Sequence, residues 1–504
     1  GTTSLGETLD SLLGVTTSDY GSAVGQPIIR GLSGSRVRIL TNGLVNRDVA
    51  GIGADHKNEV DLNDIQQIEV VRGPSSLLYA NGATGGIVNI VDNTIATSDV
   101  EKRLFKLGFE TQSVNSGDGQ SFSVADNLGG LNLYFSYSDS SFGNYDIPSG
   151  AVLHEEEEHH DDDHGDDDHD DHDEHEEDKG YLDNSDSAQE ATRFGVSKVA
   201  DWGYVGLAVS SSESIFGVPY HGEGHEGHGD EHGDEEEGHD EHEGERIFSN
   251  TESDKVNIRG QVGKVDFFFQ DSDYSHTEQH AEEEHGDEHG DEDGDHDDHG
   301  HGEEGPTTFS NDSSEFGFIV DLSNDLMTQK VSLNSSDETV KIFGDEAFMN
   351  PADREELTIG YFAKRDFDMF EVSFGVRYDQ IDTSGSLTEH HEEDGHDEDD
   401  HDEDHEEHEE ETTNYSFDSS NLSFALDLSR PLNENLNLNL GYSNVERAPS
   451  VVELFMNGPH LATGRFETGD VNLGTETSSN FDIGLSYEAD NTYASLTIFR
   501  NDVD

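Results

Sequence analysis

Histidines and carboxylates are the residues in this chain whose types and spacing suit chemistry with a metal ion. Of the 28 histidines, 26 lie in residues 154–178, 221–245, 276–304 and 390–411, which also hold 58 Asp and Glu residues and no Lys or Arg. Imidazole mixed with carboxylate suits borderline divalent ions, whereas carboxylates alone would favour calcium. In a chain without cysteine the mixture predicts capture of a divalent transition metal, Zn²⁺ first, with Cu²⁺ and Ni²⁺ as alternatives.

The other two histidines lie outside these low-complexity strings. His56 follows Asp55 in a Gly-rich stretch, and His460 lies in the segment Asn-Gly-Pro-His-Leu-Ala-Thr. An isolated loop histidine is more often an ordinary hydrogen-bonding residue, and an acidic run is more often a solvated coat. Histidine enrichment in four separate segments nevertheless favours metal binding, with mobile segments that offer many weak sites.

The charge of the chain restricts its partners. The formal net charge is −89, which excludes nucleic acid because phosphate would be repelled, and predicts cationic partners. The absence of cysteine excludes disulfides. The sequence contains neither an apolar run long enough for a membrane-spanning helix nor a signal peptide, and its first residues look like the middle of a domain.

The elements that must position these residues fall into two groups. Residues 1–95 are rich in Gly and short β-type runs, which predicts a compact α+β unit with one short helix over 60–68. Beyond residue 100 apolar and polar residues alternate with period two, which predicts strands with one apolar and one polar face. We expect fifteen such strands, near 102–112, 119–127, 131–139, 190–200, 204–213, 247–260, 264–273, 308–322, 326–336, 353–364, 368–382, 414–428, 436–445, 476–488 and 492–500.

Short turns and long connections alternate between the expected strands, which places all four acidic segments at one rim. This pattern is typical of an outer-membrane β-barrel whose apolar side faces lipid and whose polar side faces the lumen. A large soluble β-sandwich or a solenoid is the alternative, although the chain shows no fixed-period repeat. Bacterial barrels normally have an even number of strands, so we expect C-terminal strands beyond these fifteen.

Two stretches resemble the plug of TonB-dependent receptors, residues 68–91 (IEVVRGPSSLLYANGATGGIVNIV) and residues 27–44 (PIIRGLSGSRVRILTNGL). The resemblance implies a transmembrane antiparallel β-barrel of 22 strands when complete, around an N-terminal plug. We expect the plug over 1–97 and the barrel over 98–504. It further implies a monomer in the lipid of the outer membrane of a Gram-negative bacterium, energised by TonB–ExbB–ExbD, although no TonB box is evident before the plug.

The segments around His56 and His460 are similar to the zinc receptors of that family, which carry an Asp-His pair on the plug and a Gly-x-His-x-Ala-Thr segment on a barrel loop. The resemblance implies that Asp55, His56 and His460 converge on one ion. Zinc usually takes four ligands. The family's further carboxylate comes from a loop whose counterpart here falls near the end of the third acidic segment, and we assign Glu304.

These observations predict uptake of a divalent transition metal, with Zn²⁺ as the transported ligand and no catalytic cofactor. A receptor for a chelated metal of the siderophore type and a surface coat that buffers metal without transport are the alternatives. No enzyme signature is present, because the low-complexity strings of a conceivable binuclear hydrolase lack the rigid outer support that catalysis needs.

Overall fold

The computed structural model describes residues 4–21, 23–149, 151, 180–219, 247–280, 305–344, 347–389 and 411–504. Of the four acidic segments, only residues 276–280 and 411 fall within these ranges. None of the described helices has the length and apolarity needed to cross a membrane.

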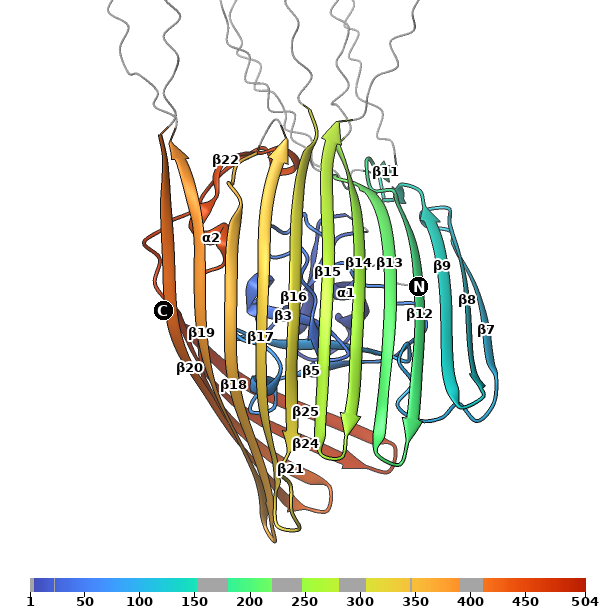
Figure 1. Ribbon diagram of the computed structural model, residues 1–504, viewed down its shortest axis with the longest axis vertical. Helices are drawn as coiled ribbons and strands as arrows, with labels where there is room; N and C mark the ends of the chain where they lie inside the picture. Colours follow the sequence, from blue (N-terminus) through green and yellow to red (C-terminus); the bar gives the residue numbers. More distant parts are fainter. Residues whose placement is uncertain are drawn as a thin grey trace, which may run out of the picture.

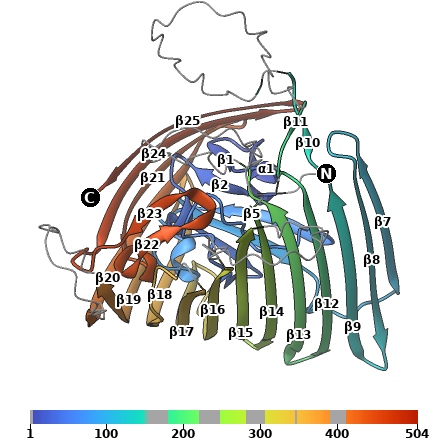
Figure 2. The ribbon, with the colours of Figure 1, turned by 90° about the horizontal axis from the view of Figure 1, so that it is seen from above.

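A single curved antiparallel sheet forms the wall of the molecule (Figures 1 and 2). Within the described residues it has fifteen strands, each paired with its neighbours in chain order, which confirms the fifteen predicted strands. The strands are Leu104–Gln112 (β7), Gly117–Leu128 (β8), Leu131–Phe142 (β9), Ser187–Ala200 (β12), Gly203–Gly217 (β13), Ile247–Val262 (β14), Val265–His280 (β15), Thr307–Asp321 (β16), Thr328–Gly344 (β17), Ala352–Phe367 (β18), Phe370–Glu389 (β19), Glu411–Asn433 (β20), Leu436–Arg447 (β21), Glu476–Ala489 (β24) and Thr492–Val503 (β25).

Burial along the strands follows the predicted alternation. In β19 the side chains of Arg377 and Asp379 are buried on the concave side, whereas Phe374 and Tyr378 are exposed on the convex side. The strand ends that flank the acidic segments lie at one rim, opposite the short turns (Figure 1). The polar face of the wall therefore encloses the lumen, and its apolar face is the outer surface.

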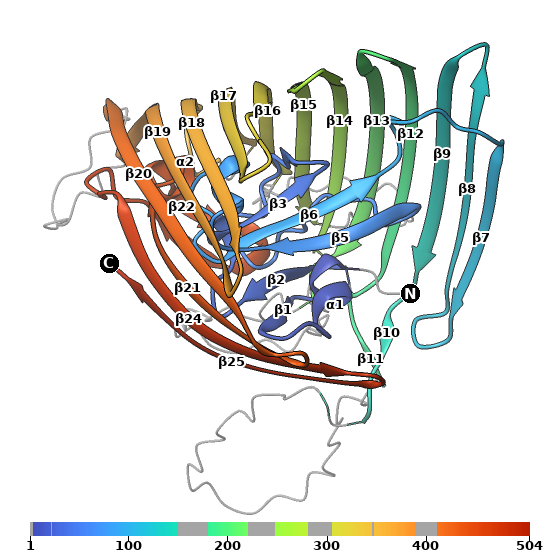
Figure 3. The same cartoon turned by 90° about the horizontal axis from the view of Figure 1, so that it is seen from below.

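The N-terminal unit lies within the curve of the wall (Figures 2 and 3). Its elements are Leu5–Leu9 (α1), Val15–Asp19 (β1), Gly25–Ile29 (β2), Gly34–Arg36 (η1), Val37–Thr41 (β3), Leu44–Val45 (β4), Ile65–Val71 (β5), Ser76–Leu78 (η2) and Gly86–Asp92 (β6). Strands β1 and β2 form a hairpin, and the four others form a sheet in the order β4-β3-β6-β5. The predicted division after residue 97 lies in the connection from β6 to β7.

The short helix predicted over residues 60–68 is wrong. Residues 65–71 form β5, which pairs antiparallel with β6. Ile65, Ile68 and Val70 pack on a core of buried α1 and β-strand residues that includes Ile39 and Val88. The tertiary partner strand therefore decides the conformation of a short segment that is ambiguous by itself.

The connection between β21 and β24 folds inward from the rim over the plug (Figures 1 and 2). It contains Val451–Phe455 (α2), Asn457–His460 (β22), Leu461–Thr463 (η3) and Arg465–Thr468 (β23). A capping box between Ser450 and Glu453 begins α2, and β22 pairs with β23. Val451 and Leu454 pack in one apolar cluster with Val49 of the plug, which fixes this connection against the plug.

Candidate metal site

The long plug loop between β4 and β5 carries Asp55 and His56. Both side chains are buried, at 3% and 0% exposure, although the loop has no regular secondary structure at these positions. Gly53 permits this conformation, since a Cβ at that position would overlap Oδ1 of Asp55. The plug therefore presents one carboxylate and one imidazole away from bulk water.

The wall contributes Glu278 from the rim end of β15. Period two along this strand points the side chains of Tyr274, His276 and Glu278 into the lumen, where all three are buried. The prediction that residues 276–304 form a loop is therefore wrong for the first five of them. They continue the strand because the β14–β15 pairing extends to His280.

The infolded connection contributes His460 at the end of β22, with 2% exposure. Asp55, His56, Glu278 and His460, hereafter the donor cluster, each offer a ligand atom, and these atoms lie within 4.8 Å of one another. One pair comes from the plug and the other pair from the wall and its connection.

Three distances within the donor cluster match those between the ligands of a tetrahedral ion. Nε2 of His56 lies 3.4 Å from Oδ2 of Asp55, and Nε2 of His460 lies 3.5 Å from the same oxygen and 3.4 Å from Oε2 of Glu278. Ligands about 2.0–2.1 Å from a tetrahedral zinc ion are about 3.3–3.5 Å from one another. The separations therefore suit atoms that share an ion.

Each of the four donors has at least one buried atom without a hydrogen bond in the described part of the chain. Oδ2 of Asp55, both ring nitrogens of His56, Oε2 of Glu278 and Nε2 of His460 have no hydrogen-bond partner among the described residues. Buried polar atoms normally have such partners, because leaving one unpaired costs about 1–3 kcal/mol. A cation bound by all four side chains would satisfy one of these atoms on each of them.

The protonation of the two histidines also bears on binding. Burial lowers the pKa of His56 to about 4, so its ring is neutral at pH 7 and available as a ligand. Burial also acts to lower the pKa of His460, but the carboxylates of Glu278 and Asp55 outweigh it and raise that pKa. The same carboxylates that favour a proton on His460 would favour a metal ion in place of that proton.

Outer residues orient the donors. Nε2 of His276 is 2.9 Å from Oε1 of Glu278, which leaves Oε2 directed to the cluster, and Nδ1 of His460 is 3.9 Å from Oε1 of Glu467. The ring of Phe309 lies 5.0 Å from that of His56 and 5.7 Å from that of His460. Such carboxylate–histidine pairs and an apolar shell usually surround protein metal sites.

Three of the predicted ligands, Asp55, His56 and His460, are brought together in the structure. Glu304 lies outside the described residues, and among the described residues Glu278 provides the wall's carboxylate in the cluster. Sequence reasoning missed Glu278 and the supporting His276 because both were assigned to an acidic loop. The alternation that continues from Tyr274 is the signal that could have found them.

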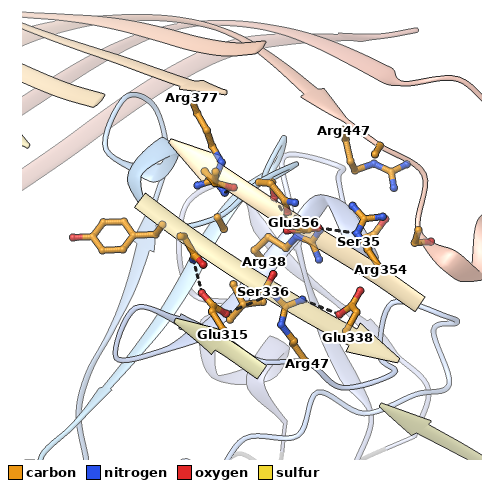
Figure 4. A pocket seen from close by; sticks show the side chains of 18 residues that line it. Ser35, Arg38, Arg47, Glu315, Ser336, Glu338, Arg354, Glu356, Arg377 and Arg447 are labelled. Carbon is orange, nitrogen blue, oxygen red and sulfur yellow. Dashed lines mark hydrogen bonds and ion pairs between the residues drawn. The ribbon is translucent and has the colours of Figure 1, made fainter. Parts of the chain in front are cut away.

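A second buried polar contact joins plug and wall, hereafter the arginine cluster (Figure 4). Its members are Arg38 and Arg47 of the plug with Glu315, Glu338, Arg354 and Glu356 of the wall, and they line a pocket of about 60 Å³. Arg47 reaches between two carboxylates, 2.7 Å from Glu338 and 3.5 Å from Glu315. Burial lowers the pKa of Arg38 to about 10, against the opposing effect of Glu356.

Comparisons with known proteins agree with this architecture. A family model described as the TonB-dependent receptor plug domain matches residues 1–87, and one described as the TonB-dependent receptor-like β-barrel matches residues 216–504. Among solved structures, the copper transporter OprC superposes with a TM-score of 0.69 at 13% identity, over 99% of this chain and 70% of that one.

Two further structures are similar in fold. The Serratia marcescens hemophore receptor HasR, solved with its hemophore and heme, has a TM-score of 0.70 at 12% identity, over 99% of this chain and 70% of the other. The FrpB iron transporter from Neisseria meningitidis has a TM-score of 0.63 at 14% identity, over 100% and 70%. At these identities the likeness concerns the fold, so the cargo must be argued from the donor cluster.

Proposed function

The chain belongs to the family of TonB-dependent outer-membrane receptors, which are transporters rather than enzymes, and we propose that its cargo within this family is the zinc ion. The observation that carries the proposal is the donor cluster. Four buried donors from the plug and the wall offer ligand atoms within 4.8 Å of one another, and three of the separations are 3.4–3.5 Å. Several of these atoms have no hydrogen-bond partner among the described residues.

The chemistry of the donors supports zinc over the other ions considered. Two imidazoles and two carboxylates without sulfur form a borderline site. A square-planar Cu²⁺ or Ni²⁺ site with bonds of about 2 Å would bring neighbouring donors to about 2.8 Å. The separations of 3.4–3.5 Å around His460 are wider and favour the tetrahedral ion.

A bare ion also suits the site better than a chelate. The four side chains are at most 3% exposed and enclose only the space between atoms 4.8 Å apart. A siderophore-type ligand would need a larger vestibule at this level. The cluster therefore supports import of an ion that has shed its water or has been passed on by other ligands.

A site divided between two bodies provides both capture and release. TonB-dependent receptors work with TonB–ExbB–ExbD, which act on the plug. Movement of the plug would carry Asp55 and His56 away from Glu278 and His460, leaving two donors on each side. Because chelation weakens sharply when ligands are lost, the ion would then leave toward the periplasm.

The acidic segments would serve the first step of import, which is the capture of ions at the rim. Their histidines and carboxylates concentrate divalent ions by charge and weak coordination, which raises the local concentration above the buried site. The strand ends that flank these segments lie at the rim toward which β15 and the connection bearing His460 also extend (Figure 1). Ions gathered there would have a short path to the donor cluster.

A double variant tests the proposal. Asp55→Ala/His56→Ala should lower zinc affinity by more than about 100-fold, because it removes both plug ligands. Gln66→Ala/Gln67→Ala, an exposed pair on β5, is the matched control. Affinity is measured by competition with a chromophoric chelator, with the acidic segments outside the described residues deleted in both variants.

Equal zinc binding by the two variants would refute the site. Anomalous scattering at the zinc, copper and nickel edges, from protein purified without added metal, would identify the ion and its ligands. Copper or nickel bound between the plug and the wall would support the proposal that the chain imports a metal ion, but would show that this ion is not zinc.

A further inference from the structure

One buried amide of the plug holds the loop that presents Asp55 and His56. Gln26 lies on β2 with 5% exposure. Its Nε2 donates to three backbone carbonyls of this loop, at 2.8 Å to Ala50, 2.7 Å to Gly53 and 2.8 Å to His56. Two amide hydrogens are thus shared among three acceptors, one of which belongs to a member of the donor cluster.

The two ends of this loop are fixed by separate contacts. Asp48 accepts hydrogen bonds from the backbone N–H groups of Ala50, at 3.1 Å, and Glu59, at 3.0 Å, which close the loop at its base. The carboxylate of Glu59 accepts from Ser212 and Thr251 of the wall, at 2.9 and 3.0 Å. The base of the loop is therefore anchored partly to the wall, while Gln26 supports its middle from the plug.

The backbone of Gln26 belongs to the N-terminal hairpin. It lies opposite Ser18 in the β1–β2 pairing, and its N–H donates to the hydroxyl of Ser18 at 3.2 Å. Helix α1 packs on both strands of this hairpin. Gln26 therefore connects the first described elements of the chain to the carbonyls behind the donor cluster.

We propose that Gln26 is a positioning residue that couples the N-terminal hairpin to the metal ligands. With the hairpin in place, the amide fixes the loop and aims Asp55 and His56 at Glu278 and His460. Displacement of the hairpin withdraws the amide, frees three carbonyls and loosens the site. This inference rests on the proposed function, because it concerns how the same site is assembled and opened.

Coupling of this kind is reciprocal. If the hairpin stabilises the geometry that binds zinc, zinc must stabilise the hairpin by the same factor. Bound zinc should therefore slow amide hydrogen exchange over residues 15–29, although no residue of that range is a ligand. A purely local role of Gln26 in loop packing would leave this exchange unchanged.

Gln26→Met is the test variant, since it keeps the length of the side chain and removes the donors. Loss of about two net hydrogen bonds predicts a tenfold to hundredfold fall in zinc affinity. Gln26→Glu should lower it further, because a carboxylate would face three carbonyl oxygens. Gln67→Met on the exposed face of β5 is the matched control and should bind zinc as the wild type does.

Hydrogen exchange completes the test on the full chain. In the wild type, saturating zinc should slow exchange over residues 15–29, and in Gln26→Met saturated with zinc this protection should be lost. Unchanged affinity in Gln26→Met, equal protection in both proteins, or no protection in the wild type would each overturn the proposal. Absence of zinc binding by the wild type would instead refute the proposed function, so the two failures are distinguishable.

Discussion

Two of the buried polar clusters between the plug and the wall treat charge in opposite ways. In the arginine cluster the plug supplies two guanidinium groups, and the wall supplies three carboxylates and the guanidinium group of Arg354, so the chain neutralises itself (Figure 4). In the donor cluster each side instead supplies one carboxylate and one imidazole.

The difference shows what each contact is for. Buried charge must be compensated, because leaving it unpaired is costly. The arginine cluster meets this need permanently and so contributes to holding plug and wall together. Under the proposed function, compensation of the donor cluster comes from a cation from outside, which would make this contact conditional on cargo. Substitutions should therefore separate the two functions, binding in one cluster and assembly in the other.

The largest expected effect is on binding in the donor cluster. Glu278→Gln removes the charged wall carboxylate and should lower zinc affinity by at least about 100-fold, more than is typical for residues that only support ligands. It should leave thermal unfolding without zinc nearly unchanged, because it also removes a buried charge. Chelator competition and calorimetry of the same sample measure both quantities. A large loss of stability with intact zinc affinity would show that Glu278 serves assembly of the plug and the wall and not zinc binding.

The corresponding change in the arginine cluster should affect assembly. Glu338→Gln leaves Arg47 buried with the more distant Glu315 as its remaining partner, which should destabilise the plug–wall contact by about 2 kcal/mol. Zinc affinity of the folded protein should stay at the wild-type level. Unfolding by denaturant and proteolysis of the plug would detect the change. Zinc affinity that fell as far as in Glu278→Gln would erase the distinction between the clusters.

The smallest expected effect tests how tightly the plug loop is shaped. Gly53→Ala places a methyl group against Oδ1 of Asp55 and should lower zinc affinity about tenfold by displacing that ligand. Gly51→Ala on the same loop meets no atom within 4 Å and should have no effect. Titration of both variants under identical conditions gives the comparison. Equal affinities would show that the loop adjusts freely.

The sequence alone determined the wall and part of the site. Alternation with period two locates strands because opposite faces of a sheet meet different surroundings, and burial alternates in this way along strands such as β12, β14 and β16. Asp55, His56 and His460 could be chosen because they lie outside the low-complexity strings and within segments that resemble a known family. The start of β5, residues 65–68, could not be predicted correctly, since its conformation depends on pairing with β6.

Only the tertiary structure shows which described carboxylate of the wall lies beside Asp55, His56 and His460. Glu278 is one of many acidic residues in its segment, and composition does not favour any one of them as a metal ligand. Glu304 was therefore chosen from its position along the chain. The register of β15 against β14, together with the curvature of the wall, determines that Glu278 faces the plug at the height of His56. Donor spacing and the support from Gln26 likewise arise from elements distant in sequence, because coordination depends on positions in space that local patterns do not encode.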